Sequence, residues 1–171
     1  MNDKEIHWEN ESLTELVNYI LKNHHGYLKK EMPLLSKLTT TILKVHGSDH
    51  RELSQVHRLF HIIKINFDQH NIIQEKNILP LIKIYERRPS KETLIEILEE
   101  IDLLGKEQDD IEYLLKELRK VTNEYTAPED GCATYDRTFE SLRELDSNIR
   151  EHLHLENNIL LPRLKNELNK Y

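Results

Sequence analysis

The chain has 171 residues, a formal net charge of −7, ten histidines and one cysteine, Cys132. This length suits one domain with one core, and the mixed charges form no basic stripe, so nucleic acid is not an expected partner. The sequence has no membrane-spanning apolar run and no apolar signal segment. We therefore expect a cytoplasmic protein without a membrane partner, in agreement with a single cysteine that cannot form an internal disulfide.

Leucine and isoleucine recur every three or four residues in the first half of the chain, which predicts two helices. The first is expected over about residues 12–45, with a kink or short break at Pro33. The second is expected over about residues 50–85. Its apolar stripe continues, at the same spacing, onto the polar residues His70 and Gln74.

Two further helices are expected in the second half, over about residues 91–123 and 134–168. The stripe of the third helix has one polar member, Gln108. The stripe of the fourth is interrupted by His152 and Glu156. In each of these helices, therefore, polar side chains fall on the face that should point into the core.

Four long helices joined by short turns predict an all-α, antiparallel, up-down-up-down four-helix bundle in a single domain, residues 1–171. At a rise of about 1.5 Å per residue, one polar residue of each helix lies at about the same level. These residues are His25, His70, Gln108 and His152. His46 lies 21 residues after His25, or about 31 Å along a helix, so we expect it at the end of the bundle.

A polar layer inside an apolar core requires a stabilising partner, since each unsatisfied polar group costs about 1–3 kcal/mol. Imidazoles with a carboxylate suit iron, zinc or manganese, and the spacing His152-x3-Glu156 puts two ligands on one helical face. His57 and His61 are expected to flank the apolar stripe instead. Cys132 has no base or second cysteine near it in the sequence, so we expect no nucleophilic role.

Several stretches resemble the hemerythrin-like domain of the iron–sulfur cluster repair proteins, also called repair-of-iron-centres proteins. The most specific is HLHLENNILLPR, which begins at His152. The others are HHGY at His24, EMP at Glu31, ILP at Ile78, and APEDGC, which ends at Cys132. The resemblance covers the chain from about Trp8 to the end and leaves out the family's small cysteine-bearing N-terminal domain.

The family holds two irons with one histidine from each of the first and third helices and a His-x3-Glu pair from each of the others. By this resemblance, the metal ligands are expected to be His25, His70, His152 and Glu156. The second-helix glutamate falls on Gln74 and the third-helix histidine on Gln108. Glu75 and Glu107 are offset by one residue and remain weak substitutes, as ligands or as residues that support the ligands.

Because Gln74 and Gln108 remove one carboxylate and one imidazole, we expect a mononuclear site, or one strong and one weak metal position. The resemblance implies one or two iron ions, with zinc or manganese as alternatives. It also implies a role in iron–sulfur cluster repair or in the response to nitric oxide or oxidative stress, with O2 or NO as ligand and iron–sulfur proteins as partners. Two alternatives stay open: a sensor or carrier of oxygen, nitric oxide or iron without catalysis, and a degenerate bundle with an empty or zinc-filled site. Whether the protein is an enzyme is also left open.

Overall fold

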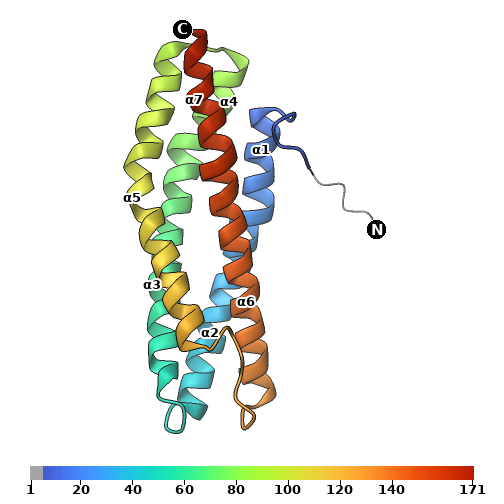
Figure 1. The fold of residues 1–171 in the computed structure, drawn as a ribbon, viewed down its shortest axis with the longest axis vertical. Coiled ribbons are helices and arrows are strands. Elements are labelled where there is room, and N and C mark those ends of the chain that lie inside the picture. The colour runs from blue at the N-terminus through green and yellow to red at the C-terminus, as the bar shows by residue number, and fades with distance from the viewer. Residues whose placement is uncertain (1–5) are drawn as a thin grey trace.

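The computed structural model describes residues 6–171, and for residues 106–109 it describes only the helical backbone. Four helical rods lie along the long axis of this part of the chain (Figure 1). The first and second rods are joined at the same end as the third and fourth, whereas the second and third are joined at the other end, next to the C-terminus. The described residues contain no strand, and the fold is the all-α four-helix bundle that the sequence predicts.

Each of the first two rods contains one short stretch of π-helix. The first rod consists of α1 (Leu13–Ile20), the π segment η1 (Leu21–His25) and α2 (Gly26–His46). The second consists of α3 (Glu52–Ile73), the π segment η2 (Gln74–Ile78) and α4 (Leu79–Arg87). The break expected at Pro33 is not found, because α2 continues through it. A proline keeps a helical φ and removes one hydrogen bond, a loss that the buried neighbours Met32 and Leu35 offset by packing.

The third rod is the single helix α5 (Lys91–Val121), which begins after Ser90, whose hydroxyl accepts a hydrogen bond from the Thr93 amide. The fourth rod consists of α6 (Ala133–His154), the π segment η3 (Leu155–Leu160), α7 (Leu161–Glu167) and the 3-10 turn η4 (Leu168–Lys170). Pro80 and Pro162 stand in the first turns of α4 and α7, directly after π segments, where their missing amide hydrogen is tolerated.

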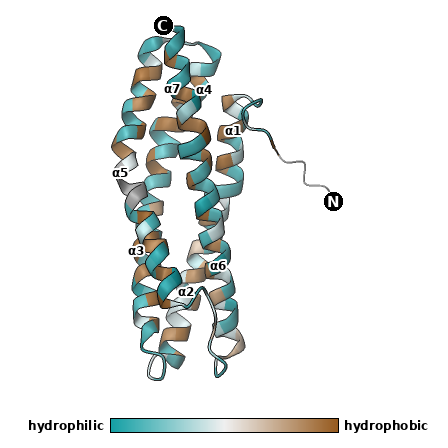
Figure 2. Cartoon of the chain, viewed as in Figure 1, coloured by the Kyte–Doolittle hydropathy of each residue, from teal (hydrophilic) through white to brown (hydrophobic). Residues whose placement is uncertain are grey.

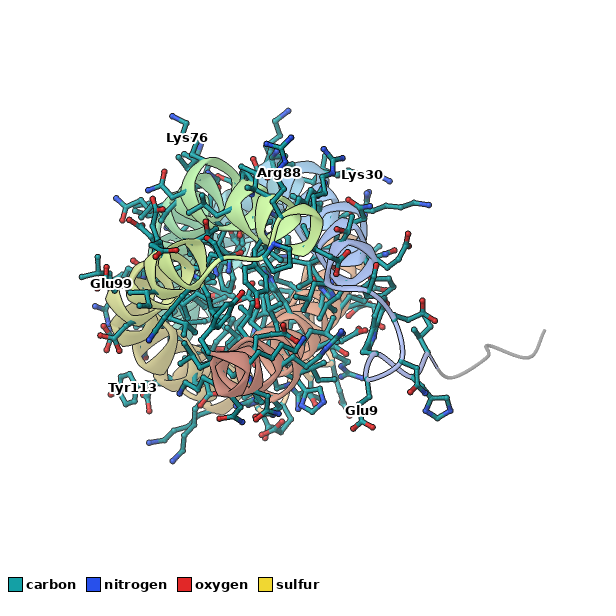
Figure 3. All side chains as sticks on the ribbon, turned by 90° about the horizontal axis from the view of Figure 1, so that it is seen from above. Glu9, Lys30, Lys76, Arg88, Glu99 and Tyr113 are labelled. Atoms are coloured by element: carbon teal, nitrogen blue, oxygen red, sulfur yellow. The ribbon has the colours of Figure 1, made fainter. Side chains whose placement is uncertain are left out.

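The core has two apolar parts with a polar layer between them. One part gathers around Phe60 and Phe67 and contains residues of α2, α3, α5 and α6. The other is built mainly from α1, α4, α5 and α7, around Ile82 and Leu164. Figure 2 shows hydrophobic residues on the sides of the rods that face one another. Seen from above, labelled charged residues such as Lys76 project outward from the rods (Figure 3).

The layer between the two apolar parts is made of buried histidine, glutamine and glutamate side chains, namely His24, His25, His70, Gln74, His152 and Glu156. Close-packed hydrocarbon on both sides holds these side chains in fixed positions. None of the described helices is long and apolar enough to cross a membrane.

Candidate metal centre

The three π segments lie at the polar layer. The segment η1 ends at His25, η2 begins at Gln74, and η3 contains Glu156. A π segment inserts one extra residue into a helix and is often found at functional sites. In η1 it accompanies the burial of two consecutive histidines, so His24, which regular helical spacing turns away from the stripe, is buried beside His25.

Three of these side chains form a compact group. His25, His152 and Glu156 are all buried, and each offers one ligand atom within 4.8 Å of the other two. The closest contact joins His152 Nε2 and Glu156 Oε1, which are 2.5 Å apart. Ligands about 2.0–2.2 Å from one zinc or iron ion lie ~3–4 Å from each other. Small side-chain movements would therefore allow one ion to contact all three.

His70 lies on the other side of the same carboxylate. Its Nε2 is 3.3 Å from Glu156 Oε2, and its ring is 5.9 Å from the ring of His152. Although His70 is fully buried, neither of its ring nitrogens has an aligned hydrogen-bond partner within the described residues. A cation held between His70 Nε2 and Glu156 Oε2 would replace this poorly aligned contact, and an unsatisfied buried nitrogen costs about 1–3 kcal/mol.

Gln74 occupies the space between His25 and Glu156. Its Oε1 is 2.9 Å from His25 Nε2, and its Nε2 donates to Glu156 Oε1 at 2.6 Å. On the opposite nitrogen, His25 Nδ1 is 3.0 Å from the Glu75 carboxylate, which is also bound by Lys29. Glu75 therefore faces the far side of the imidazole, where it orients His25 and leaves Nε2 pointing inward.

No tautomer of a neutral His25 satisfies all of these contacts. A neutral His25 that donates from Nδ1 to Glu75 has a lone pair at Nε2, which then faces the carbonyl oxygen of Gln74. Reversing the Gln74 amide would instead put its oxygen against Glu156. A cation between these atoms removes the conflict, and this arrangement of donors therefore fits a bound metal ion.

The protonation states also suit a metal. Burial opposes ionisation of Glu156, but the charges of His152 and His70 and the hydrogen bond from His152 outweigh it and hold the pKa well below its usual value. Burial lowers the pKa of His25, and the nearby His152 lowers it further. At neutral pH the carboxylate is ionised and His25 is neutral, which are the forms that bind metals.

The remaining histidines lie outside this group. His24 is buried, with Nδ1 3.0 Å from Asn148 Oδ1, and its ring stacks on His152. His154 is exposed and contacts Asn158, while His57 and His61 contact hydroxyl groups of α2.

The sequence also predicts contributions from Gln108 and Glu107 of the third rod, but their side chains lie outside the described residues. Where α5 passes the layer, Ile101 and Leu104 close a cavity of about 20 Å³ that Gln74 and Glu156 also line. This space admits one water-sized group next to the carboxylate.

A four-helix bundle with a buried histidine–carboxylate group between two apolar cores defines a class of helical cation-binding protein. Residues 16–164 match the hemerythrin HHE cation binding domain. The chain therefore belongs to the hemerythrin HHE family.

Relatives of the chain are named for the repair of iron–sulfur clusters. The iron-sulfur cluster repair protein ScdA of Staphylococcus epidermidis is 26% identical over 153 residues, which cover 90% of this chain and 67% of the relative. A probable iron-sulfur cluster repair protein of Haemophilus influenzae is 28% identical, covering 97% and 70%. YtfE of Citrobacter koseri, also named as a repair protein, is 24% identical, covering 91% and 68%. The chain thus matches about two thirds of the length of each.

Acidification is expected to destabilise the metal-free protein. Burial lowers the pKa of His24 and His25, so the unfolded chain binds more protons than the folded chain below the usual value of 6.5. Folding stability must then fall as the pH drops through that value. The lowered pKa of Glu156 acts with the same sign, because its contribution is present above the usual value of 4.5 and is lost at lower pH.

Thermal melting in EDTA, from about pH 7.5 to about pH 5, measures this dependence. The bond to Asp130 raises the pKa of His50, which acts in the opposite direction, so His50→Gln provides a cleaner background. A melting temperature that stays constant or rises on acidification would contradict the expected protonation of buried histidines.

Proposed function

We propose that the protein binds iron in the polar layer and acts in the repair of iron–sulfur clusters, in response to nitric oxide or oxidative damage. The observation that supports metal binding is the buried group of His25, His152 and Glu156, whose ligand atoms lie within 4.8 Å of one another. The repair role is supported by the names of relatives that match 90% or more of the chain. Iron–sulfur proteins would then be its partners.

The proposed site is asymmetric. Two histidines and one carboxylate form a set typical of Fe(II), and His25, His152 and Glu156 would supply it. His70, near the second oxygen of Glu156, would supply a weaker position. Gln74 brings only a neutral oxygen to this layer, so it cannot replace the anionic bridge that a second glutamate provides. We therefore propose one tightly held ion per chain.

Residues in and around the layer have distinct tasks in this proposal. Glu156 supplies the negative charge, and Glu75 keeps the Nε2 of His25 directed inward. Ile101 and Leu104 limit the adjacent space to one water-sized group. When bound, iron would supply a Lewis-acidic, redox-active centre for a small ligand such as NO or O2.

Metal content and cluster reactivation together test the proposal. Protein purified from its native host without added metal should contain about one iron per chain, and EDTA should lower its melting temperature because the ion stabilises only the folded state. Nitric oxide should change the visible spectrum, and the iron-loaded protein should restore activity to a damaged iron–sulfur enzyme. Two tightly held irons per chain would contradict the asymmetric site.

A second candidate is a sensor or carrier of oxygen or nitric oxide. The depth of the site favours it, since the side chains of His25, His152 and Glu156 are at most 6% exposed. A diatomic molecule needs far less opening of the bundle than an iron ion that must leave. Ligand binding without any reactivation of a damaged enzyme would support this candidate and exclude repair.

A third candidate is a metal-free or zinc-filled core. It is favoured by the Gln74 amide, which donates to Glu156 and places its oxygen 2.9 Å from His25 Nε2, where a protonated His25 would donate to it. A melting temperature that does not respond to removal of metal would support the metal-free form. Zinc in place of iron in the natively purified protein would support the zinc-filled one.

A further inference from the structure

The only cysteine of the chain meets a histidine at the end of the bundle opposite the C-terminus (Figure 1). Cys132 Sγ lies 3.1 Å from His46 Nε2. No base lies near Cys132 in the sequence, but the fold brings one to it: His46 is 86 positions away and meets Cys132 where α2 ends and α6 begins, so the conclusion drawn from the sequence that Cys132 lacks a nearby base was wrong. Cys132 is exposed, so molecules in solution can reach its sulfur.

The surroundings of Cys132 favour the thiolate. The hydrogen bond with His46 lowers the pKa of the thiol, and the backbone amides of Tyr135 and Thr134 lower it further. Cys132 is the N-cap residue of α6, where the helix dipole also favours negative charge. A thiolate at neutral pH is the nucleophilic form of cysteine.

Two carboxylates at this end of the bundle pair with a second histidine, His50. His50, in the turn after α2, lies 3.0 Å from the carboxylate of Asp130 in the linker. Its other ring nitrogen is 3.3 Å from Glu52, at the start of α3. His46 of α2 therefore contacts Cys132, while His50 pairs with the carboxylates of Asp130 and Glu52.

A second feature of this region indicates a ligand. Tyr135 is completely buried, and its hydroxyl has no hydrogen-bond partner within the described part of the chain. Its ring packs edge-on against His46 at 5.3 Å and against His50 at 5.6 Å. Burial raises the pKa of its hydroxyl to about 12, and the negative charges of Glu52 and Asp130 contribute to the increase.

Tyr135 also forms part of the wall of a surface hollow of about 290 Å³, between Glu52, Phe139 and the linker residues 126–129. A buried hydroxyl without a partner costs about 1–3 kcal/mol. A small molecule whose polar group reached this hydroxyl through the hollow would lie about one helical turn from Cys132, which stands three residues before Tyr135.

We propose that Cys132 is a thiol–disulfide exchange site for a small peptide-like thiol, whose polar part occupies the hollow beside Tyr135. His46 takes the thiol proton, and the thiolate attacks one sulfur of the small disulfide. A new S–S bond joins Cys132 to that sulfur, while the other sulfur leaves as a thiolate and takes the proton from His46. The small disulfide is the oxidant, so Cys132 is oxidised as the leaving thiol is reduced.

Glutathione disulfide serves as the probe, with the mixed disulfide of the intact protein quantified by mass spectrometry. At about pH 6.5 we expect His46→Gln to slow the exchange about tenfold, because the substitution raises the thiol pKa and lowers the fraction of thiolate. That loss outweighs the higher intrinsic nucleophilicity of the more basic thiolate. His154→Gln is the control, since His154 is exposed and contacts Asn158 at the other end of α6, and the rate of this variant should stay close to that of the unchanged protein. Equal rates for the unchanged protein and His46→Gln would overturn the proposal.

Two further measurements keep the proposal testable if His46→Gln does not fold. Ultraviolet absorbance of the unchanged protein reports thiolate directly, and a thiol that ionises only near its usual pKa of about 8.5 would overturn the proposal. The exchange rate should reach a plateau as the concentration of glutathione disulfide rises. Tyr135→Phe should shift that plateau to higher concentrations. A strictly linear dependence would show that no small molecule binds in the hollow.

Discussion

Replacing His152 with alanine is expected to abolish metal binding. His152 is fully buried and contacts the Glu156 carboxylate, and the rings of His24, His25 and His70 surround it. Loss of a residue that merely supports a ligand lowers metal affinity about 10–100-fold, so loss of this proposed ligand should cost at least about 100-fold. Metal content should fall to the background level, and EDTA should no longer change the melting temperature.

His154→Ala is the matched control for this experiment. His154 lies two residues further along the same rod but is exposed and contacts only Asn158 among the described hydrogen bonds. Its replacement should leave the metal content and the response to EDTA intact. A His152→Ala protein that keeps its full metal content would place the metal somewhere other than the polar layer.

Gln74→Glu is expected to destabilise the metal-free protein and to stabilise the metal-bound protein. The Gln74 amide donates to Glu156 at 2.6 Å, so the substitution sets two buried carboxyl groups against each other. Without metal, an uncompensated buried charge costs about 3–5 kcal/mol, part of which is relieved when one carboxyl group takes up a proton. With metal, the added carboxylate can bridge toward His70, and the protein should bind a second ion.

The exposed Gln69 on α3 provides the control Gln69→Glu, which adds the same charge outside the core. Melting curves with EDTA and with added iron, together with metal analysis, give both quantities for each variant. If Gln74→Glu neither weakens the metal-free protein nor raises the metal content, Gln74 does not determine the asymmetry of the site.

The sequence predicts that His25, His152 and Glu156 lie close together. Where long helices are joined by short turns, the number of residues between a turn and a side chain gives the height of that side chain along the bundle. The ligand atoms of these three residues lie within 4.8 Å of one another in the fold. His70 could be placed in the same way, and it lies against Glu156. In each case the apolar stripe of the helix identifies the face and the distance from the turn gives the level.

The π segments could not be predicted from a regular period of about 3.6 residues, because one inserted residue shifts the face of every residue that follows. A regular period turns His24 away from the core, so it does not predict that His24 is buried next to His25. A signal was present in the sequence, since Pro80 and Pro162 each stand six residues after the core positions Gln74 and Glu156. A proline lacks the amide hydrogen of a regular helix, which favours a change in the backbone pattern before it, although α2 continues through Pro33 without one.

The contact of His46 with Cys132 depends on where two rod ends meet, so no local pattern predicts it. Periodicity and rise place residues along and around one rod. They do not tell which side chains of a turn and a linker come together across the end of the bundle. The fold is needed to find that pair.

Anomalous X-ray scattering from crystals, recorded at the iron and zinc absorption edges, tests metal binding most directly. We predict one strong iron peak in contact with His25 Nε2, His152 Nε2 and a Glu156 oxygen, with at most a weaker second peak near His70. If protein from its native host shows no peak in this layer and Gln74 still bridges His25 and Glu156, the proposed metal centre is wrong.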